Sequence, residues 1–156
     1  ERGWQGSERH GVGGSWLILF CDSSALVKLY LQEDDSGAVR SQAAASELLA
    51  VCRIAWVEVM SALARRSRER PQDTAAIATA RERFQADWPR YLCLELTQEL
   101  AELAGDYADT FALRAYDSVQ LAAAELARRD MPGDVKFACF DARLVKAARV
   151  LGSEAV

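Results

Sequence analysis

The hydrophobic residues of the chain fall into short continuous runs that are separated by longer stretches with helical spacing. The first run, WLILFC at residues 16–21, is apolar throughout and is followed at once by an acid, which is typical of a buried strand. We expect strands at 16–21, 48–55, 91–96, 135–140 and 154–156, and helices at 23–31, 37–48, 56–70, 72–87, 97–110, 111–129 and 141–152. Strands that alternate with helices predict a three-layer α/β/α domain with a central parallel sheet of four to five strands.

One domain accounts for most of the chain. Residues 1–15 are rich in glycine and have no apolar period, so we predict a flexible leader there and a single domain at 16–156. A length of 156 residues fits one domain that buries a sizeable core. The composition, 51% hydrophobic and 27% charged, is typical of a globular protein.

Charge and cysteine content limit the possible partners and compartments. The formal net charge is −4, whereas a protein that coats nucleic acid is usually basic, so any contact with nucleic acid should be local. The four cysteines form no CxxC pair and lie in apolar runs, which favours buried free thiols: Cys21, Cys52, Cys93 and Cys139. The first apolar run is far shorter than the ~18–20 residues that a membrane span needs, and it has no signal-peptide pattern. We predict a cytoplasmic protein without membrane contact.

Several kinds of chemistry lack the residues that they require. His10 is the only histidine and lies in the predicted leader, which leaves triads, His-based ribonucleases and HExxH zinc sites without their histidine. The chain has no GxxxxGK[ST] phosphate loop, and the GVGG at 11–14 precedes the first strand instead of following it. Carboxylates remain as the candidate functional groups.

Three acids stand at the junctions between strands and helices. Asp22 and Asp141 each end a predicted strand, so they belong at the carboxyl edge of the sheet, where α/β proteins bind ligands. Each also precedes a helix, and an aspartate N-cap worth ~1 kcal/mol is an equally good explanation for either residue alone. Glu58 opens the helix after the second strand, where the helix dipole by itself favours an acid.

Asp117 is harder to explain structurally. It falls on the apolar stripe of its predicted helix, beside Leu113, Gln120 and Leu121. Because an unpaired buried carboxylate is costly, this position predicts a cation or a hydrogen-bond network. A salt bridge with Arg114 is the structural alternative. Together, four acids at one sheet edge supply the oxygen ligands of Mg²⁺ or Mn²⁺, and such an ion can activate water and neutralise charge on a phosphate.

The segments around these four acids resemble PIN-domain nucleases, most closely the VapC-type toxins of bacterial toxin–antitoxin pairs. The similarity runs from about Trp16 to Gly152, and the third motif is the most specific. The four matching motifs, each with its acid, are CDSSALVKLYLQE (Asp22), WVEVMSALAR (Glu58), LRAYDSVQLAAA (Asp117) and FACFDARLVKAA (Asp141).

This resemblance implies a PIN-like fold and a Mg²⁺- or Mn²⁺-dependent endoribonuclease that hydrolyses RNA phosphodiester bonds. It also implies that the four acids are catalytic metal ligands, that a small antitoxin inhibits the enzyme and that the toxin forms homodimers. A hydroxyl beside the first acid often supports the family's site, and Ser23 and Ser24 both qualify.

Basic residues suggest where phosphates would bind. A cluster on the helix of Glu58 could contact RNA or an antitoxin, or could simply complement the helix dipole: Arg65, Arg66, Arg68 and Arg70. Arg114 and Arg143 lie within three residues of a proposed acid and are the better candidates for substrate contact.

Two other functions are compatible with the pattern. A non-catalytic PIN-like binding module would use its acids only as helix caps, and metal binding would separate it from a nuclease. Another phosphoryl-transfer enzyme is disfavoured, because CDSSA lacks the DxD spacing of haloacid-dehalogenase-like phosphatases and the adjacent acid pair of receiver domains is missing.

Overall fold

The central strand β1, Leu17–Cys21, is buried over nearly its whole length and pairs in parallel on both sides. β2 (Leu48–Cys52) lies on one side of it and β4 (Asp134–Ala138) on the other. β3 (Leu92–Leu94) and β5 (Glu154–Ala155) complete a parallel sheet of order β3-β2-β1-β4-β5. The computed structural model describes residues 15–156, and in this part of the chain it confirms the predicted parallel sheet.

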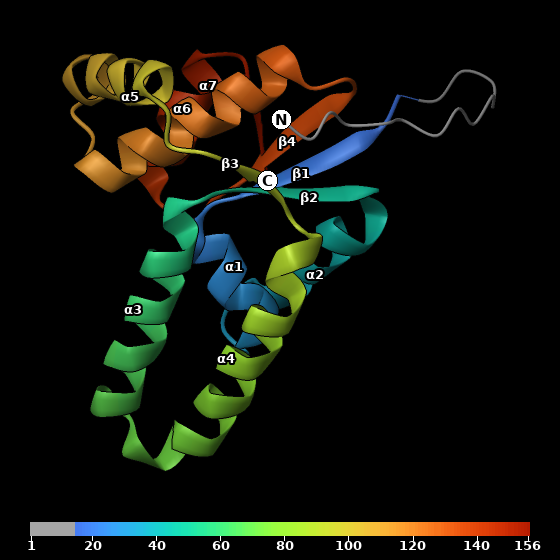
Figure 1. Cartoon of the computed structure of the whole chain (residues 1–156), viewed down its shortest axis with the longest axis vertical. Helices are drawn as coiled ribbons and strands as arrows, with labels where there is room; N and C mark the ends of the chain where they lie inside the picture. The colour runs from blue at the N-terminus through green and yellow to red at the C-terminus, as the bar shows by residue number, and fades with distance from the viewer. Residues whose placement is uncertain (1–14) are drawn as a thin grey trace.

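Helices cover both faces of the sheet (Figure 1). On one face lie α1 (Ser23–Tyr30), α2 (Ser36–Ala45), α3 (Ile54–Glu69) and α4 (Thr74–Asp87), and on the other lie α5 (Gln98–Phe111), α6 (Ala115–Asp130) and α7 (Ala142–Val150). The short 3₁₀ turns Pro71–Asp73 and Trp88–Arg90 flank α4. α3 and α4 run side by side as an arm that extends beyond the sheet (Figure 1). The fold is the predicted three-layer α/β/α arrangement.

The alternation of side chains along β1 divides the core in two. Ile18 and Phe20 pack against the layer of α5, α6 and α7, whereas Leu19 and Cys21 pack against the layer of α1 to α4. This is the outcome of the two-residue period of a strand that is buried on both faces. The sheet is thereby fixed from both sides, which holds its carboxyl edge in place.

Several predicted boundaries were wrong by a few residues. β2 ends at Cys52 and α3 begins at Ile54, because the apolar run at 48–55 is shared between a strand and a helix start. Leu48, which we assigned to the preceding helix, opens β2. The helix predicted at 111–129 begins only at Ala115, since Ala112 ends α5 in the left-handed conformation, with φ of 52°. The predicted leader falls almost entirely on residues 1–14, which lie outside the described part.

The cysteines and the apolar segments can be compared with their predictions. In residues 15–156 all four cysteines are free; Cys21, Cys52 and Cys139 are buried, and Cys93 is half-buried at the outer strand β3. None of the described helices combines the length and the hydrophobicity that crossing a bilayer demands.

We expect Gly133→Ala to destabilise the fold strongly. Gly133 has φ of +125°, and a Cβ there would lie 2.3 Å from the carbonyl oxygen of Trp16, which accepts a hydrogen bond from the Asp134 amide at 2.7 Å. The backbone strain alone costs about 1–3 kcal/mol, and the clash adds to it. Gly152→Ala is the matched control, because Gly152 also has a positive φ, of +79°, but open space around it. Urea unfolding should show a clearly larger loss for Gly133→Ala; equal losses would exclude the clash.

Candidate active site

Asp22 lies at the carboxyl end of β1 and begins α1. Its Oδ1 accepts hydrogen bonds from the amide of Ala25 at 2.9 Å and from Ser24 Oγ at 2.6 Å, so it is the N-cap of the helix. The capping explanation is therefore correct as far as geometry goes. It leaves unexplained why a capping carboxylate is only 4% exposed, since N-caps need no burial.

The surroundings of Asp22 disfavour its charge. Burial raises the pKa of Asp22 to about 7; the hydrogen bonds from Ser24 and Ala25 oppose this rise, and the negative charges of Glu58 and Asp117 add to it. Asp22 is thus close enough to two of the other acids for their charges to repel its own. The ionised form of Asp22 is therefore energetically unfavourable at this position.

Glu58 lies in the second turn of α3, because the helix begins four residues before it. The prediction that Glu58 opens the helix was wrong, and a first-turn dipole effect does not account for this acid. Its carboxylate accepts hydrogen bonds from Ser23 Oγ at 3.1 Å and from Gln120 Nε2 at 2.7 Å. Burial raises the pKa of Glu58, these two hydrogen bonds lower it, and the charge of Asp117 raises it further.

Asp117 occupies the first turn of α6 and is half-buried. The buried face of the helix begins with Ser118 and Gln120, so Asp117 lies at the rim of the apolar stripe and not within it. Burial raises the pKa of Asp117, and so does the charge of Asp141, whereas the charge of Arg114 lowers it. No ion pair joins Asp117 to Arg114 in the described chain, so the structural alternative finds no support there.

Asp141 follows β4 and caps α7. Its Oδ1 accepts hydrogen bonds from the amides of Arg143 at 2.9 Å and Leu144 at 3.0 Å, while its side chain stays exposed. Since its charge acts on Asp117, the four acids form a connected chain of repelling groups at one edge of the sheet. The sequence placed Asp141 directly at the end of a strand, but β4 ends three residues earlier.

The two serines support different acids. Ser23 Oγ donates to Glu58, and Ser24 Oγ donates to Asp22 and accepts a hydrogen bond from the amide of Phe140 at 3.2 Å. The sequence did not distinguish Ser23 from Ser24 as the supporting hydroxyl, and in the structure each serine supports a different acid. One consequence is that α1 orients carboxylates that come from β1 and from α3.

Two adjoining cavities open at the acids. The first, which we call the Asp141 cavity, measures about 640 Å³ and is lined by Asp141, Ser24, Lys28, Arg66 and Arg70, among others. The second, which we call the Asp117 cavity, measures about 460 Å³, and ten residues line it: Ser23, Ile54, Val57, Glu58, Ser61, Ala62, Arg65, Arg114, Tyr116 and Asp117. Ser23, Ala62 and Arg65 line both cavities, so the two share a wall.

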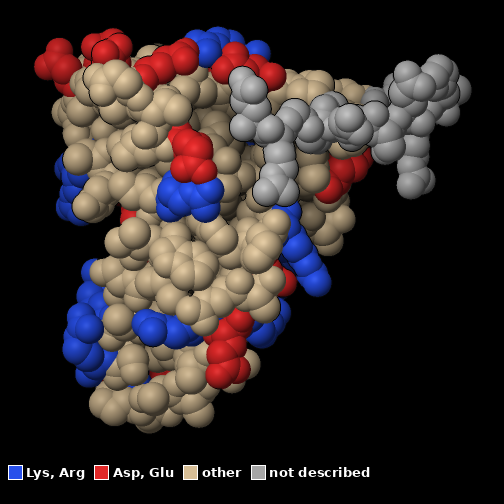
Figure 2. Space-filling model, in the orientation of Figure 1, with Lys and Arg blue, Asp and Glu red and all other residues tan. Residues whose placement is uncertain are grey.

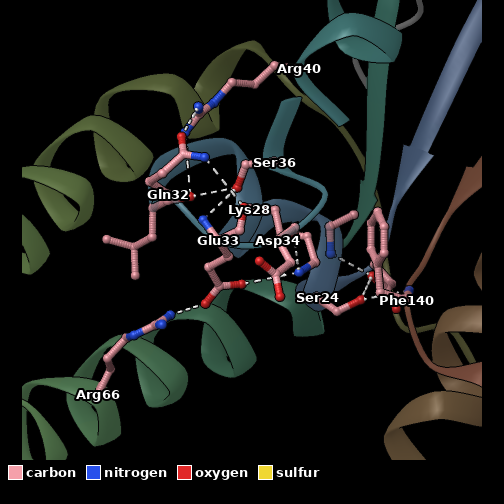
Figure 3. A network of polar contacts seen from close by, with 12 residues as sticks. Ser24, Lys28, Gln32, Glu33, Asp34, Ser36, Arg40, Arg66 and Phe140 are labelled. Atoms are coloured by element: carbon pink, nitrogen blue, oxygen red, sulfur yellow. Dashed lines mark hydrogen bonds and ion pairs between the residues drawn. The ribbon is translucent and has the colours of Figure 1, made fainter. Parts of the chain in front are cut away.

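Basic side chains gather along the α3 side of the arm (Figure 2). Most of them are paired: Arg66 contacts Glu33, which also receives Lys28 Nζ at 3.4 Å (Figure 3). Lys28 further donates to the carbonyl of Asp34 at 2.8 Å and lies over the ring of Phe140. Arg70 is 3.7 Å from Asp73. Three of the four arginines of the predicted cluster, Arg65, Arg66 and Arg70, therefore have an acidic partner within the fold.

Arg65 and Arg114 are better placed for phosphate contact than the other basic residues. Arg65 lines both cavities, and Arg114 lines the Asp117 cavity. Arg143, our other sequence-based candidate, has an exposed side chain that lines neither cavity. Its contact with the site is the backbone amide that donates to Asp141.

The donors at the site are oxygens only. In residues 15–156, no three acidic, thiol or imidazole side chains converge closely enough to chelate a metal ion on their own. Mg²⁺ is usually held by one or two carboxylates together with water and substrate phosphates, so an open set of carboxylates fits such an ion and not a closed zinc site. Burial raises the pKa values of Asp22, Glu58 and Asp117, and the charges of neighbouring acids raise them further.

Gln120 is the site residue that sequence reasoning missed. It is 2% exposed and donates Nε2 to Glu58, while its Oε1 is a buried acceptor without a partner. An unpaired buried amide oxygen is unfavourable, which suggests a role beyond packing. In the sequence, only its place on the same helix face as Asp117 could have indicated this role. Its partner Glu58 is 62 residues away in the sequence, so no local pattern predicts the contact.

Most of the chain matches one known protein family. The PIN-domain model matches residues 19–150, which include all four acids. The chain belongs to the PIN-domain family. It is 33% identical to ribonuclease VapC45 and to ribonuclease VapC49, from two strains of Mycobacterium tuberculosis, over 86% of its own length and 92% of theirs. The predicted PIN-domain, VapC-type identity is confirmed, and the phosphatase and receiver alternatives are wrong.

A solved structure agrees with the family on the fold. A toxin–antitoxin complex from Klebsiella pneumoniae contains a chain that superposes with a TM-score of 0.60 at 19% identity, and the match covers 89% of this chain and 95% of that one. At this identity the likeness concerns the fold, which is PIN-like as predicted.

Proposed function

We propose that this chain is an endoribonuclease that hydrolyses RNA phosphodiester bonds, and that it is the toxin of a toxin–antitoxin pair. The observation that carries the proposal is the set of four mutually repelling carboxylates at the carboxyl edge of the sheet. Two relatives that share a third of its sequence are named ribonucleases, and a structure with its fold is a toxin–antitoxin complex.

We further propose that the nuclease depends on Mg²⁺ or Mn²⁺, with Asp22, Glu58, Asp117 and Asp141 as the residues that would hold the ion. When bound, such an ion makes water a better nucleophile and stabilises the charge that develops on the phosphate. These four acids are also the catalytic residues of the proposal, because they touch the groups that react.

The other residues of the site prepare it for this task. Ser23 and Gln120 fix both oxygens of Glu58, and Ser24, itself held by the amide of Phe140, fixes one oxygen of Asp22, so that neither carboxylate must reorganise before reaction. Arg65 and Arg114 line the cavities as cations and can bind the phosphates that flank the scissile bond. A homodimer and a cytoplasmic location stay predictions.

Cleavage of RNA tests the proposed activity. Purified chain should cut single-stranded RNA in Mg²⁺ or Mn²⁺, should be silent in chelator, and should recover when the ion is restored. Glu58→Gln, which keeps the shape and both hydrogen-bonding partners within reach, should lose most of this activity. A folded chain that binds RNA but neither binds metal nor cuts RNA would instead be the non-catalytic binding module.

Metal should also stabilise the protein. The acids repel one another when no cation is present, and an ion that binds only the folded state raises its stability by mass action, by about 2.7 kcal/mol at a concentration one hundred times its Kd. We expect the melting temperature to rise in millimolar Mn²⁺ and to return in chelator. Asp106→Asn, an exposed acid on α5 away from the site, should leave the rise intact. An unchanged melting temperature would count against metal binding.

The antitoxin is tested by co-purification with the product of an adjacent small gene. The four acids form an anionic cluster, so a partner could block them by inserting an arginine or lysine side chain. We expect a stable complex in which nuclease activity is suppressed. Recovery of the active nuclease alone, with the second protein expressed and soluble, would refute the pairing.

A further inference from the structure

The Asp117 cavity has an apolar wall that the folding of the chain does not explain. Tyr116 is 59% exposed and Val57 is 64% exposed, and both line this cavity together with Ile54. Neither Tyr116 nor Val57 belongs to the two hydrophobic cores of the described chain. Exposed apolar groups that gather in one hollow, beside polar groups, are typical of a binding site.

The position of Tyr116 relates this wall to the acids. Tyr116 directly precedes Asp117 in the first turn of α6, so its ring lies at the edge of the acidic site. Arg65 and Arg114 line the same cavity. Arg65 reaches Glu69 only at 3.9 Å, with both side chains largely exposed, and such a surface pair is weak enough to yield to a phosphate. The cavity thus combines an aromatic face, two cations and two carboxylates.

This combination fits one unpaired nucleotide. An aromatic ring binds a base by stacking, arginines bind the phosphates on either side of it, and the carboxylates lie where the backbone would be cut. A base in a duplex has its faces covered by its neighbours, so the same cavity would not accept it.

We infer that Tyr116 is the stacking platform for an unpaired RNA base next to the scissile phosphate, with Val57 as the apolar floor of this subsite. The inference rests on the proposed ribonuclease function and adds to it the side chain that contacts a base beside the cut. Stacking recognises the π-face that every base has, so the subsite selects strandedness more than sequence.

The test uses binding and cleavage separately. The probe is a set of single-stranded RNA octamers, each with one 2-aminopurine at a different position, in Ca²⁺ for binding and in Mg²⁺ for cleavage. The wild type should quench the fluorescence at one position. Tyr116→Leu, which keeps the bulk but cannot stack, should abolish the quenching and raise the Kd and the KM by roughly 5- to 150-fold. Tyr116→Phe should stay within about twofold of the wild type.

The controls separate the possible failures. Trp16→Leu makes a like change at a 51% exposed aromatic residue on the other end of β1 and should have no effect. If the wild type cleaves RNA, unchanged binding by Tyr116→Leu would overturn the stacking role. A loss of binding in Tyr116→Phe as large as that in Tyr116→Leu would overturn it as well. Position-specific quenching without cleavage would keep the subsite and refute the ribonuclease. Loss of antitoxin binding alone in Tyr116→Leu would assign the ring to a protein partner and overturn the inference.

Discussion

Replacing Asp117 with asparagine is expected to lower the rate of RNA cleavage by roughly 10²- to 10³-fold, while the domain stays folded. Asparagine keeps the shape of the side chain and removes the charge that would hold a cation. Because Asp117 is half-buried at the rim of the stripe, with burial and Asp141 both disfavouring its charge, the metal-free variant should be at least as stable as the wild type. Steady-state cleavage and urea unfolding of the same preparation measure both effects.

The structural alternative predicts the reverse. If Asp117 served only to pair with Arg114, the asparagine variant would leave a cation unpaired, and breaking a buried pair costs about 3–5 kcal/mol with little change in activity per folded molecule. Arg114 is exposed, and the described residues show no ion pair between the two, so this loss is not expected. Asp106→Asn on α5 is the matched control for removing one acid. A destabilised but fully active Asp117→Asn protein would refute the catalytic assignment.

The position of the acids at one edge could be predicted because strand ends carry geometric information. Continuous apolar runs located β1, β2 and β4, and the carboxyl ends of parallel strands must share an edge. The boundary after β2 was wrong, since Ile54 and Ala55 look in the sequence like the end of the apolar run at 48–55 but begin α3 in the structure. The left-handed conformation of Ala112, which ends α5 and so delays the start of α6, could not be predicted from the residue type, because alanine rarely adopts this conformation.

The connections within the site depend on tertiary contacts that no local pattern contains. Gln120 on α6 meets Glu58 from the opposite layer of helices, and Ser23 meets it from α1 in the same layer. Arg65 proved better placed than Arg143, because the direction of α3 carries it along both cavities while the side chain of Arg143 leaves the site. Sequence proximity to an acid led to Arg114, which lines the Asp117 cavity, but also to Arg143, which lines neither cavity, and it missed Arg65.

The metal-free protein should lose stability as the pH rises from about 4 to about 7, and Asp22 should be a main cause. Its pKa in the folded state is raised to about 7 from an ordinary value of 3.8, chiefly by burial. Within this window the folded protein keeps the proton that the unfolded chain has released, so the free energy of unfolding falls as pH increases. A shift of this size corresponds to roughly 4 kcal/mol across the whole window, and above it the effect is constant.

Asp22→Asn isolates this contribution, because asparagine is as good an N-cap as aspartate and can keep the hydrogen bonds from Ala25 and Ser24. In chelator at pH 8 the variant should be more stable than the wild type by about 1–4 kcal/mol, whereas at about pH 3.5, where Asp22 is largely protonated in the unfolded chain as well as in the folded one, the two should be nearly equal. Saturating Mn²⁺ should reverse the order at pH 8, since the wild type gains the cation that its carboxylates lack. Urea unfolding of both proteins at the two pH values measures this. A variant that is less stable than the wild type in chelator at pH 8 would show that the buried carboxylate is a structural cap and not one member of a site built for a cation.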